Sequence, residues 1–220
     1  MSIFVTGNTT TPTSMVILMH GYGANGEDLI DLGREWQEHF PDTVFIAPNA
    51  PTICELSPLG YQWFSLTDWS PVAMDQGARR AAPWINELID TQLKAYGVAP
   101  EKLVLSGFSQ GTMMGLYVAL RRPQRIAGVL GYSGALLCAD EWPHITLQKP
   151  PICLVHGIAD NVVPVAAYYH AAQMFEQNDF DFEGHVLHGL LHGINQYGID
   201  IGTAFLGRVL GNSPPTERVR

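Results

Sequence analysis

The fold of this 220-residue chain is decided by the stretch Leu103-Val-Leu-Ser-Gly107-Phe-Ser109-Gln-Gly111-Thr-Met-Met-Gly-Leu116. Its first residues form a short, fully apolar run, as in a parallel strand covered on both faces. The residues after Gly111 have the spacing of a helix that lies against such a sheet. Between them, Gly-x-Ser-x-Gly forms a turn too tight for Cβ atoms at its two glycines. We therefore expect Ser109 to stand exposed and strained on a strand-to-helix turn, where a nucleophile would be carried.

Alternating apolar runs and helical patterns extend this prediction to the whole chain. Six runs predict strands: Met15 to Met19, Val44 to Ala47, Leu103 to Leu105, Ile126 to Leu130, Ile152 to Val155 and Phe182 to Leu187. Five segments predict helices: Asp28 to Phe40, Ala78 to Tyr96 with a kink or a start near Pro83, Gln110 to Arg121, Val165 to Gln177, and Asn195 to Val209. This order predicts an α/β fold with a mostly parallel, doubly wound sheet and helices on both faces.

Bulk properties limit the classes of function. A hydrophobic content of 46% with 15% charged residues is typical of a compact globule, and we expect one domain over residues 1–220, with residues 211–220 frayed. A net charge of −9 argues against nucleic acid or an anionic membrane surface as partner. The first apolar run is too short for membrane insertion. Three scattered cysteines, without metal-ligand spacing or a leader ahead of them, favour a cytoplasmic protein.

A serine nucleophile needs a base, and the base needs a third group to fix its tautomer. The run Ile152 to Val155 leads into His156-Gly-Ile-Ala-Asp160, which places Asp160 just beyond a strand end. The competing interpretation of Asp160 is a helix cap before Val165.

The base follows the next strand, where His188 and His192 compete. We choose His192 because it lies beside Gly193 in a loop that can bend back over the nucleophile, and we assign His188 a structural role. Together with His185 the two histidines could ligate zinc, but their spacing matches no zinc signature, so no metal is expected.

The oxyanion formed by attack on a carbonyl needs preorganised backbone N–H donors. Gln110, directly after the serine, would supply one, and Tyr22 in the glycine-rich turn His20-Gly-Tyr-Gly-Ala-Asn-Gly26 the other. The same glycines resemble a dinucleotide loop, but Pro48 and Asn49 stand where its acidic residue is required. A second glycine-flanked serine, Ser133, has its following glycine one position too early and is predicted to be structural.

These motifs, in the order Leu18-Met-His-Gly-Tyr-Gly23, Gly107-Phe-Ser-Gln-Gly111, His156-Gly-x-x-Asp160-x-Val-Val-Pro164 and His192-Gly-Ile, closely resemble those of the phospholipase/carboxylesterase family, which includes the acyl-protein thioesterases. The resemblance covers Met15 to Leu210 and implies the α/β-hydrolase fold, a Ser109–His192–Asp160 triad and an oxyanion hole at Tyr22 and Gln110. It also implies a small ester or acyl-thioester substrate, no cofactor and a homodimer as a candidate assembly. Thr112, where thioesterases commonly have glycine, favours bacterial carboxylesterases.

We predict a serine esterase for short to medium acyl chains, with lysophospholipase or acyl-protein thioesterase as the alternatives. A binding protein on an inactive hydrolase scaffold would be expected to lack a triad member, and none is missing here. The apolar segment 53–69, broken by Pro58 and Gly60, is expected to be a loop that shapes the acyl pocket through Trp63, Phe64 and Leu66. The sequence leaves open whether Trp63 and Phe64 fill the core instead.

Overall fold

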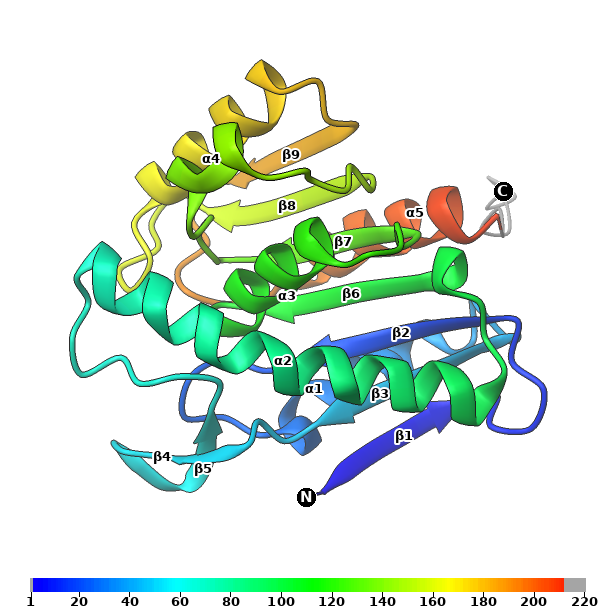
Figure 1. Ribbon diagram of the computed structural model, residues 1–220. Coiled ribbons are helices and arrows are strands. Elements are labelled where there is room, and N and C mark those ends of the chain that lie inside the picture. The colour runs from blue at the N-terminus through cyan, green and yellow to red at the C-terminus, as the bar shows by residue number, and fades with distance from the viewer. Residues whose placement is uncertain (1, 212–220) are drawn as a thin grey trace.

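The computed structural model describes residues 2–211, and most of the tail expected to fray lies outside them. One seven-stranded sheet runs in the order β1-β3-β2-β6-β7-β8-β9, with every neighbouring pair parallel except β1 and β3 (Figure 1). Its strands are β1 (Ile3–Gly7), β2 (Ser14–Met19), β3 (Thr43–Pro48), β6 (Leu103–Phe108), β7 (Gly128–Tyr132), β8 (Ile152–Gly157) and β9 (Phe182–Leu187). The predicted mostly parallel α/β sheet is confirmed.

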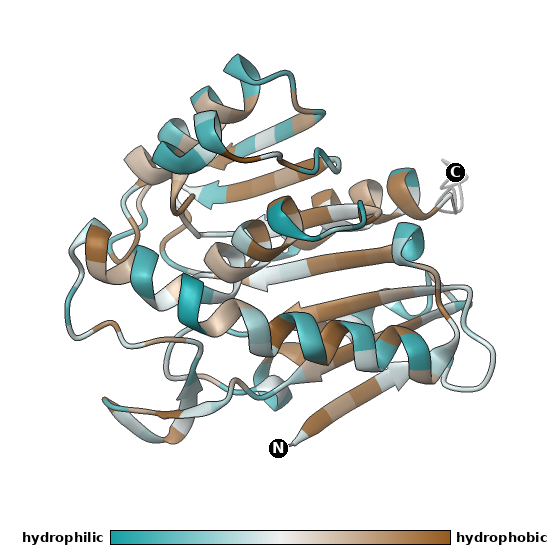
Figure 2. Cartoon of the chain, in the orientation of Figure 1, coloured by the Kyte–Doolittle hydropathy of each residue, from teal (hydrophilic) through white to brown (hydrophobic). Residues whose placement is uncertain are grey.

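Helices cover both faces of this sheet. The helices are α1 (Gly26–Trp36), α2 (Pro71–Tyr96), α3 (Gln110–Arg121), α4 (Val165–Gln177) and α5 (Gln196–Leu210). Two buried clusters fill the two interfaces, the larger beneath α2, α3 and α4 and the smaller beneath α1 and α5. Figure 2 shows the central strands β6 and β8 as apolar over much of their length, with pale or hydrophilic carboxyl ends, whereas α2 turns a polar surface outward.

The prediction for the second helix is wrong at its start. The helix begins at Pro71, where the Ser70 hydroxyl accepts a hydrogen bond from the Ala73 amide, and it continues unbroken through Pro83. A proline inside a helix leaves the carbonyl four residues earlier without its N–H partner. Arg79, which carries that carbonyl, and Pro83 are both exposed, so water can take the place of the missing donor.

Three strands were not predicted. The edge strand β1 pairs only with β3, and its short apolar run, Ile3 to Val5, was not recognised as a strand in the sequence. Within the segment expected to be a loop, β4 (Thr52–Cys54) and β5 (Ser57–Gln62) form a hairpin. Pro58 is tolerated there because a two-stranded hairpin offers free edges, where a missing N–H breaks no ladder. Gly60 fits because the Gly23 backbone approaches it so closely that an added Cβ would collide with the Gly23 carbonyl.

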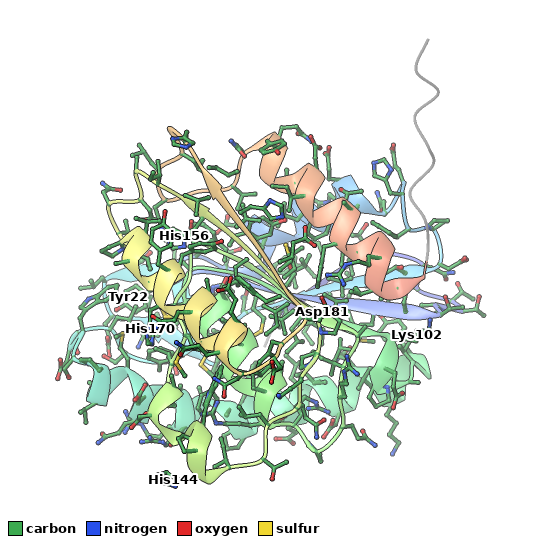
Figure 3. All side chains as sticks on the ribbon, turned by 90° about the horizontal axis from the view of Figure 1, so that it is seen from above. Tyr22, Lys102, His144, His156, His170 and Asp181 are labelled. Atoms are coloured by element: carbon green, nitrogen blue, oxygen red, sulfur yellow. The ribbon has the colours of Figure 1, made fainter. Side chains whose placement is uncertain are left out.

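The parallel strands bring their carboxyl ends to one edge of the sheet. Figure 3 shows Tyr22, His156 and His170 on this side of the molecule, and Lys102, directly before β6, on the opposite side. The loops that follow β2, β6, β8 and β9 therefore meet at the same edge. No helix between residues 2 and 211 combines the length and the apolar character needed to cross a bilayer.

Candidate active site

Ser109 occupies the turn between β6 and α3 with φ 54° and ψ −117°, a conformation that residues with a Cβ rarely adopt. The turn depends on its two glycines, since a Cβ on Gly107 would collide with the Gly111 backbone and one on Gly111 with the Met19 carbonyl. Strain is thus present as expected. The expected exposure is not, because only 8% of Ser109 is accessible to solvent. Ser109 is therefore recessed below the protein surface.

Asp160 and His192 are brought together by the loops after β8 and β9. His192 Nδ1 lies 2.8 Å from Asp160 Oδ2, and the Asp160 side chain is fully buried. The other carboxylate oxygen accepts the Val162 and Val163 amides at 2.9 and 2.8 Å. These bonds hold the carboxylate in its own loop, and the residue that caps α4 is Pro164, so the helix-cap interpretation of Asp160 is wrong.

The charge of this carboxylate is stabilised by its partners. Burial alone would raise the pKa of Asp160, but the hydrogen bonds from His192 and from the two loop amides outweigh it and hold that pKa below its ordinary value. The imidazole ring of His192 packs on Phe108, with 4.8 Å between ring centroids, directly beside Ser109 in the chain. The three residues predicted to form a triad thus meet at one edge of the sheet.

His188 and His185, the other histidines near the end of β9, do not contact Asp160 in this way. His188 is exposed, and His185 Nε2 pairs with Glu183 Oε1 at 2.7 Å. Cys153, Glu183 and His185 place possible metal-ligand atoms within 4.8 Å of one another on β8 and β9. Burial raises the pKa of the Cys153 thiol, so this ligand stays in its protonated, weakly coordinating form. We assign no metal to the group.

Tyr22 and Gln110 lie on either side of Ser109. A Cβ added to Gly21 would come 3.4 Å from Ser109 Cβ, so the loop that carries the Tyr22 amide lies against Ser109. Gln110 is the first residue of α3, and its N–H has no carbonyl partner within the helix. Among residues 2–211 the Tyr22 N–H also has no protein acceptor. Both donors are available to an oxyanion.

Trp63, Phe64 and Leu66 are buried in the larger core cluster. Trp63 Nε1 donates to the His20 carbonyl at 2.8 Å, and its backbone N–H donates to Gln110 Oε1 at 3.0 Å. Gln110 Nε2 in turn donates to the Phe64 carbonyl at 2.8 Å. The structure therefore favours the interpretation that Trp63 and Phe64 fill the core. It also shows hydrogen bonds between these residues and His20 and Gln110 that the sequence did not indicate.

Thr112 and Asn195 both have structural partners. Thr112 Oγ1 donates toward the carbonyls of Gly107 and Tyr132, 2.7 and 2.9 Å away, which ties the nucleophile turn to β7. Asn195 caps α5 by accepting the Gly198 amide at 2.9 Å. Ser133 is buried at the end of β7, in agreement with a structural role.

An apolar groove of about 670 Å³ opens at the same edge, between the first turn of α2, the loop after β7 and α4. Its walls include Val72, Met74, Leu136 and Leu137. The loop enters the groove directly from Gly134, where an added Cβ would come 3.1 Å from the Ser109 carbonyl oxygen. The sequence did not indicate this groove, because its walls come from three separate segments, residues 71–75, 135–140 and 170–174.

Comparisons with known proteins agree with this architecture. Acyl-protein thioesterase 1 of Schizosaccharomyces pombe is 31% identical over 186 residues, covering 78% of this chain and 82% of the relative. The same-named protein of Emericella nidulans is 29% identical over 220 residues, covering 90% and 91%. The crystal structure of esterase PE8 superposes with a TM-score of 0.91 at 37% identity, covering 95% of this chain and 99% of that one.

The sequence profile of the Phospholipase/Carboxylesterase family matches residues 2–209. The match includes every strand of the seven-stranded sheet and the loops that carry Ser109, Asp160 and His192. With the sheet order and the recessed serine turn, it identifies the chain as an α/β-hydrolase and a carboxylic ester hydrolase. The chain belongs to the phospholipase/carboxylesterase family.

Proposed function

We propose that Ser109, His192 and Asp160 form the catalytic triad of a serine esterase. The observation that carries the proposal is the 2.8 Å bond between His192 Nδ1 and a fully buried Asp160, beside a serine held at positive φ. With Nδ1–H donated to the carboxylate, Nε2 is left as the proton acceptor.

In this mechanism Ser109 Oγ attacks the acyl carbon while its proton passes to His192 Nε2. The negative charge on the former carbonyl oxygen is stabilised by the N–H groups of Tyr22 and Gln110. The tetrahedral intermediate then expels the alcohol or thiol, which takes the proton from His192. Water attacks the acyl-enzyme with His192 again as base, and the acid leaves with Ser109 restored.

We propose the groove between α2 and α4 as the acyl-binding site. Its volume, about 670 Å³, is within the range of about 300–1,000 Å³ typical of small-molecule sites, and its walls are largely apolar. The acyl-protein thioesterases among the relatives favour a thioester as the second candidate substrate class.

The test is a kcat/KM series over p-nitrophenyl esters of rising acyl length, with an acyl thioester in parallel. Ser109→Ala should abolish turnover without a change in Tm, and retained turnover would contradict the triad. Met74→Trp, which narrows the groove, should lower kcat/KM for long acyl chains and leave acetate unchanged. The matched control is Leu59→Trp, an 89% exposed position on the β4–β5 hairpin, where no chain-length effect is expected.

We also propose that the chain acts as one domain in the cytoplasm. One continuous sheet supports the single domain. Three buried, unpaired cysteines, Cys54, Cys138 and Cys153, support a reducing compartment. The homodimer stays a prediction of the family resemblance, and sedimentation velocity would measure it.

A further inference from the structure

His20, the last residue before the oxyanion loop, has two hydrogen bonds that fix its tautomer. Its Nδ1 lies 2.7 Å from the Gly21 carbonyl oxygen, which can only accept, so Nδ1 carries a proton. Its Nε2 accepts the Ala50 amide at 2.9 Å, so Nε2 carries none. The ring is 1% exposed, and burial lowers the pKa of His20 despite the opposing effect of the Gly21 bond. The imidazole is therefore neutral with its proton on Nδ1.

The Gly21 carbonyl held by His20 belongs to the same peptide unit as the Tyr22 N–H. A trans peptide is planar, and its C=O and N–H point in opposite directions. No peptide bond of the described residues is cis. A bond that fixes the Gly21 oxygen therefore also fixes the direction of the Tyr22 N–H.

The same peptide segment is held from its other side by the β5 strand and by Trp63. Gly23 N–H donates to the Tyr61 carbonyl at 2.9 Å, and Tyr61 N–H donates to the Ala24 carbonyl at 2.7 Å. The indole of Trp63 holds the His20 carbonyl, and its backbone N–H reaches the Gln110 side chain. The two proposed oxyanion donors are thus connected by a continuous set of buried hydrogen bonds.

We propose that His20 is a positioning residue that aims the Tyr22 N–H at the oxyanion through its Nδ1–H bond to Gly21. The inference rests on the proposed function, because it assigns a role within that oxyanion hole. If His20 had only a structural role, loss of either of its two hydrogen bonds would affect catalysis equally. In the proposed role only the Nδ1 bond affects catalysis, because it acts on the Tyr22 peptide and the Nε2 bond does not.

Two substitutions separate the two bonds. In His20→Asn the side-chain amide can replace Nδ1–H as donor to Gly21, while the acceptor for Ala50 is lost. In His20→Gln the side-chain oxygen can replace Nε2 as acceptor for Ala50, while the side-chain donor to Gly21 is lost and only the longer bond from the Ala24 amide, at 3.3 Å, remains on that carbonyl. Each variant removes one buried hydrogen bond, so we expect comparable decreases in Tm.

We expect His20→Gln to lower kcat for p-nitrophenyl acetate by about 10²-fold, the lower end of the range for loss of an oxyanion donor, with KM nearly unchanged. His20→Asn should retain kcat within about tenfold of wild type. His20→Gln should also bind a boronic acid, which forms a tetrahedral adduct with the serine, more weakly than His20→Asn does. Equal kcat losses in the two variants, or a loss confined to KM, would overturn the inference.

A measurement on the unaltered protein keeps the test independent of how the variants fold. The imidazole ¹⁵N spectrum of wild type should show His20 protonated at Nδ1 alone, and a proton on Nε2 would overturn the inference. If Ser109→Ala is inactive and the two His20 variants behave alike, the inference fails and the proposed esterase stands. If wild type hydrolyses no ester, the proposed function itself has failed.

Discussion

Replacing Asp160 by Asn changes one atom of the proposed triad and tests whether the Asp160 carboxylate fixes the tautomer of His192. The Asn oxygen should stay where Oδ1 now accepts the Val162 and Val163 amides, because the reverse orientation would point an NH₂ group at two buried N–H donors. Leaving each of these N–H donors without an acceptor would cost about 1–3 kcal/mol. The Asn NH₂ then faces His192 Nδ1 at the present position of Oδ2.

This orientation forces the wrong tautomer on His192. Nδ1 must accept from the Asn NH₂, so the proton moves to Nε2, the atom that should take the proton of Ser109. In serine hydrolases the corresponding change lowers kcat about 10⁴-fold, which is roughly 5.4 kcal/mol of transition-state stabilisation. The Asp160 side chain is fully buried, so water cannot replace the carboxylate. We expect a loss of kcat of that order.

The assay is kcat for p-nitrophenyl acetate, with circular dichroism and Tm to verify the fold. Asp200→Asn, at an exposed position on α5, is the matched control and should leave kcat unchanged. A folded Asp160→Asn variant with kcat within about tenfold of wild type would refute the assignment of Asp160 as the group that orients the base.

Three further predictions follow from the same geometry. Gly111→Ala should unfold the protein or abolish activity, as measured by Tm and kcat, because its Cβ would collide with the Met19 carbonyl. His188→Ala should leave kcat unaltered because the side chain is exposed, and a loss comparable to that of the proposed base would show that the wrong histidine was chosen. The free energy of unfolding should fall as pH drops below 6.5, since burial lowers the folded-state pKa of His20 and His156 and the unfolded chain takes up protons first. Urea unfolding at pH 7.5 and 5.5 should differ by at most about 1.4 kcal/mol for each of the two histidines, and equal stability would contradict their burial in the neutral form.

The parts of this protein that could be predicted are those whose signal is local. The apolar run before Ser109, its glycines and the helix after them lie within fourteen residues, and the observed β6 and α3 agree with them. The strands before Asp160 and His192 could be predicted for the same reason. The edge strand β1 was missed although it contains the apolar run Ile3 to Val5, because three apolar residues near a chain end do not by themselves distinguish a strand from a loop.

The roles of buried polar side chains could not be predicted either. His20 and Trp63 were visible as a histidine before a glycine-rich turn and as an aromatic residue in a broken segment. Apart from the adjacent Gly21 carbonyl, their partners belong to residues distant in sequence, since Ala50 is 30 positions from His20, and Trp63 and His20 are 43 positions apart. A sequence pattern contains no information on which carbonyl a folded chain will present to an indole N–H.

The position of β9 at the edge of the sheet has a consequence for how activity is lost. Within the sheet this strand pairs only with β8, its residues are mostly half-buried, and the loop after it supplies His192. Regions with few buried contacts open at a lower free energy than the core. Detachment of β9 would separate the proposed base from the proposed nucleophile while the central strands remain assembled. Activity would then be lost before the sheet as a whole unfolds.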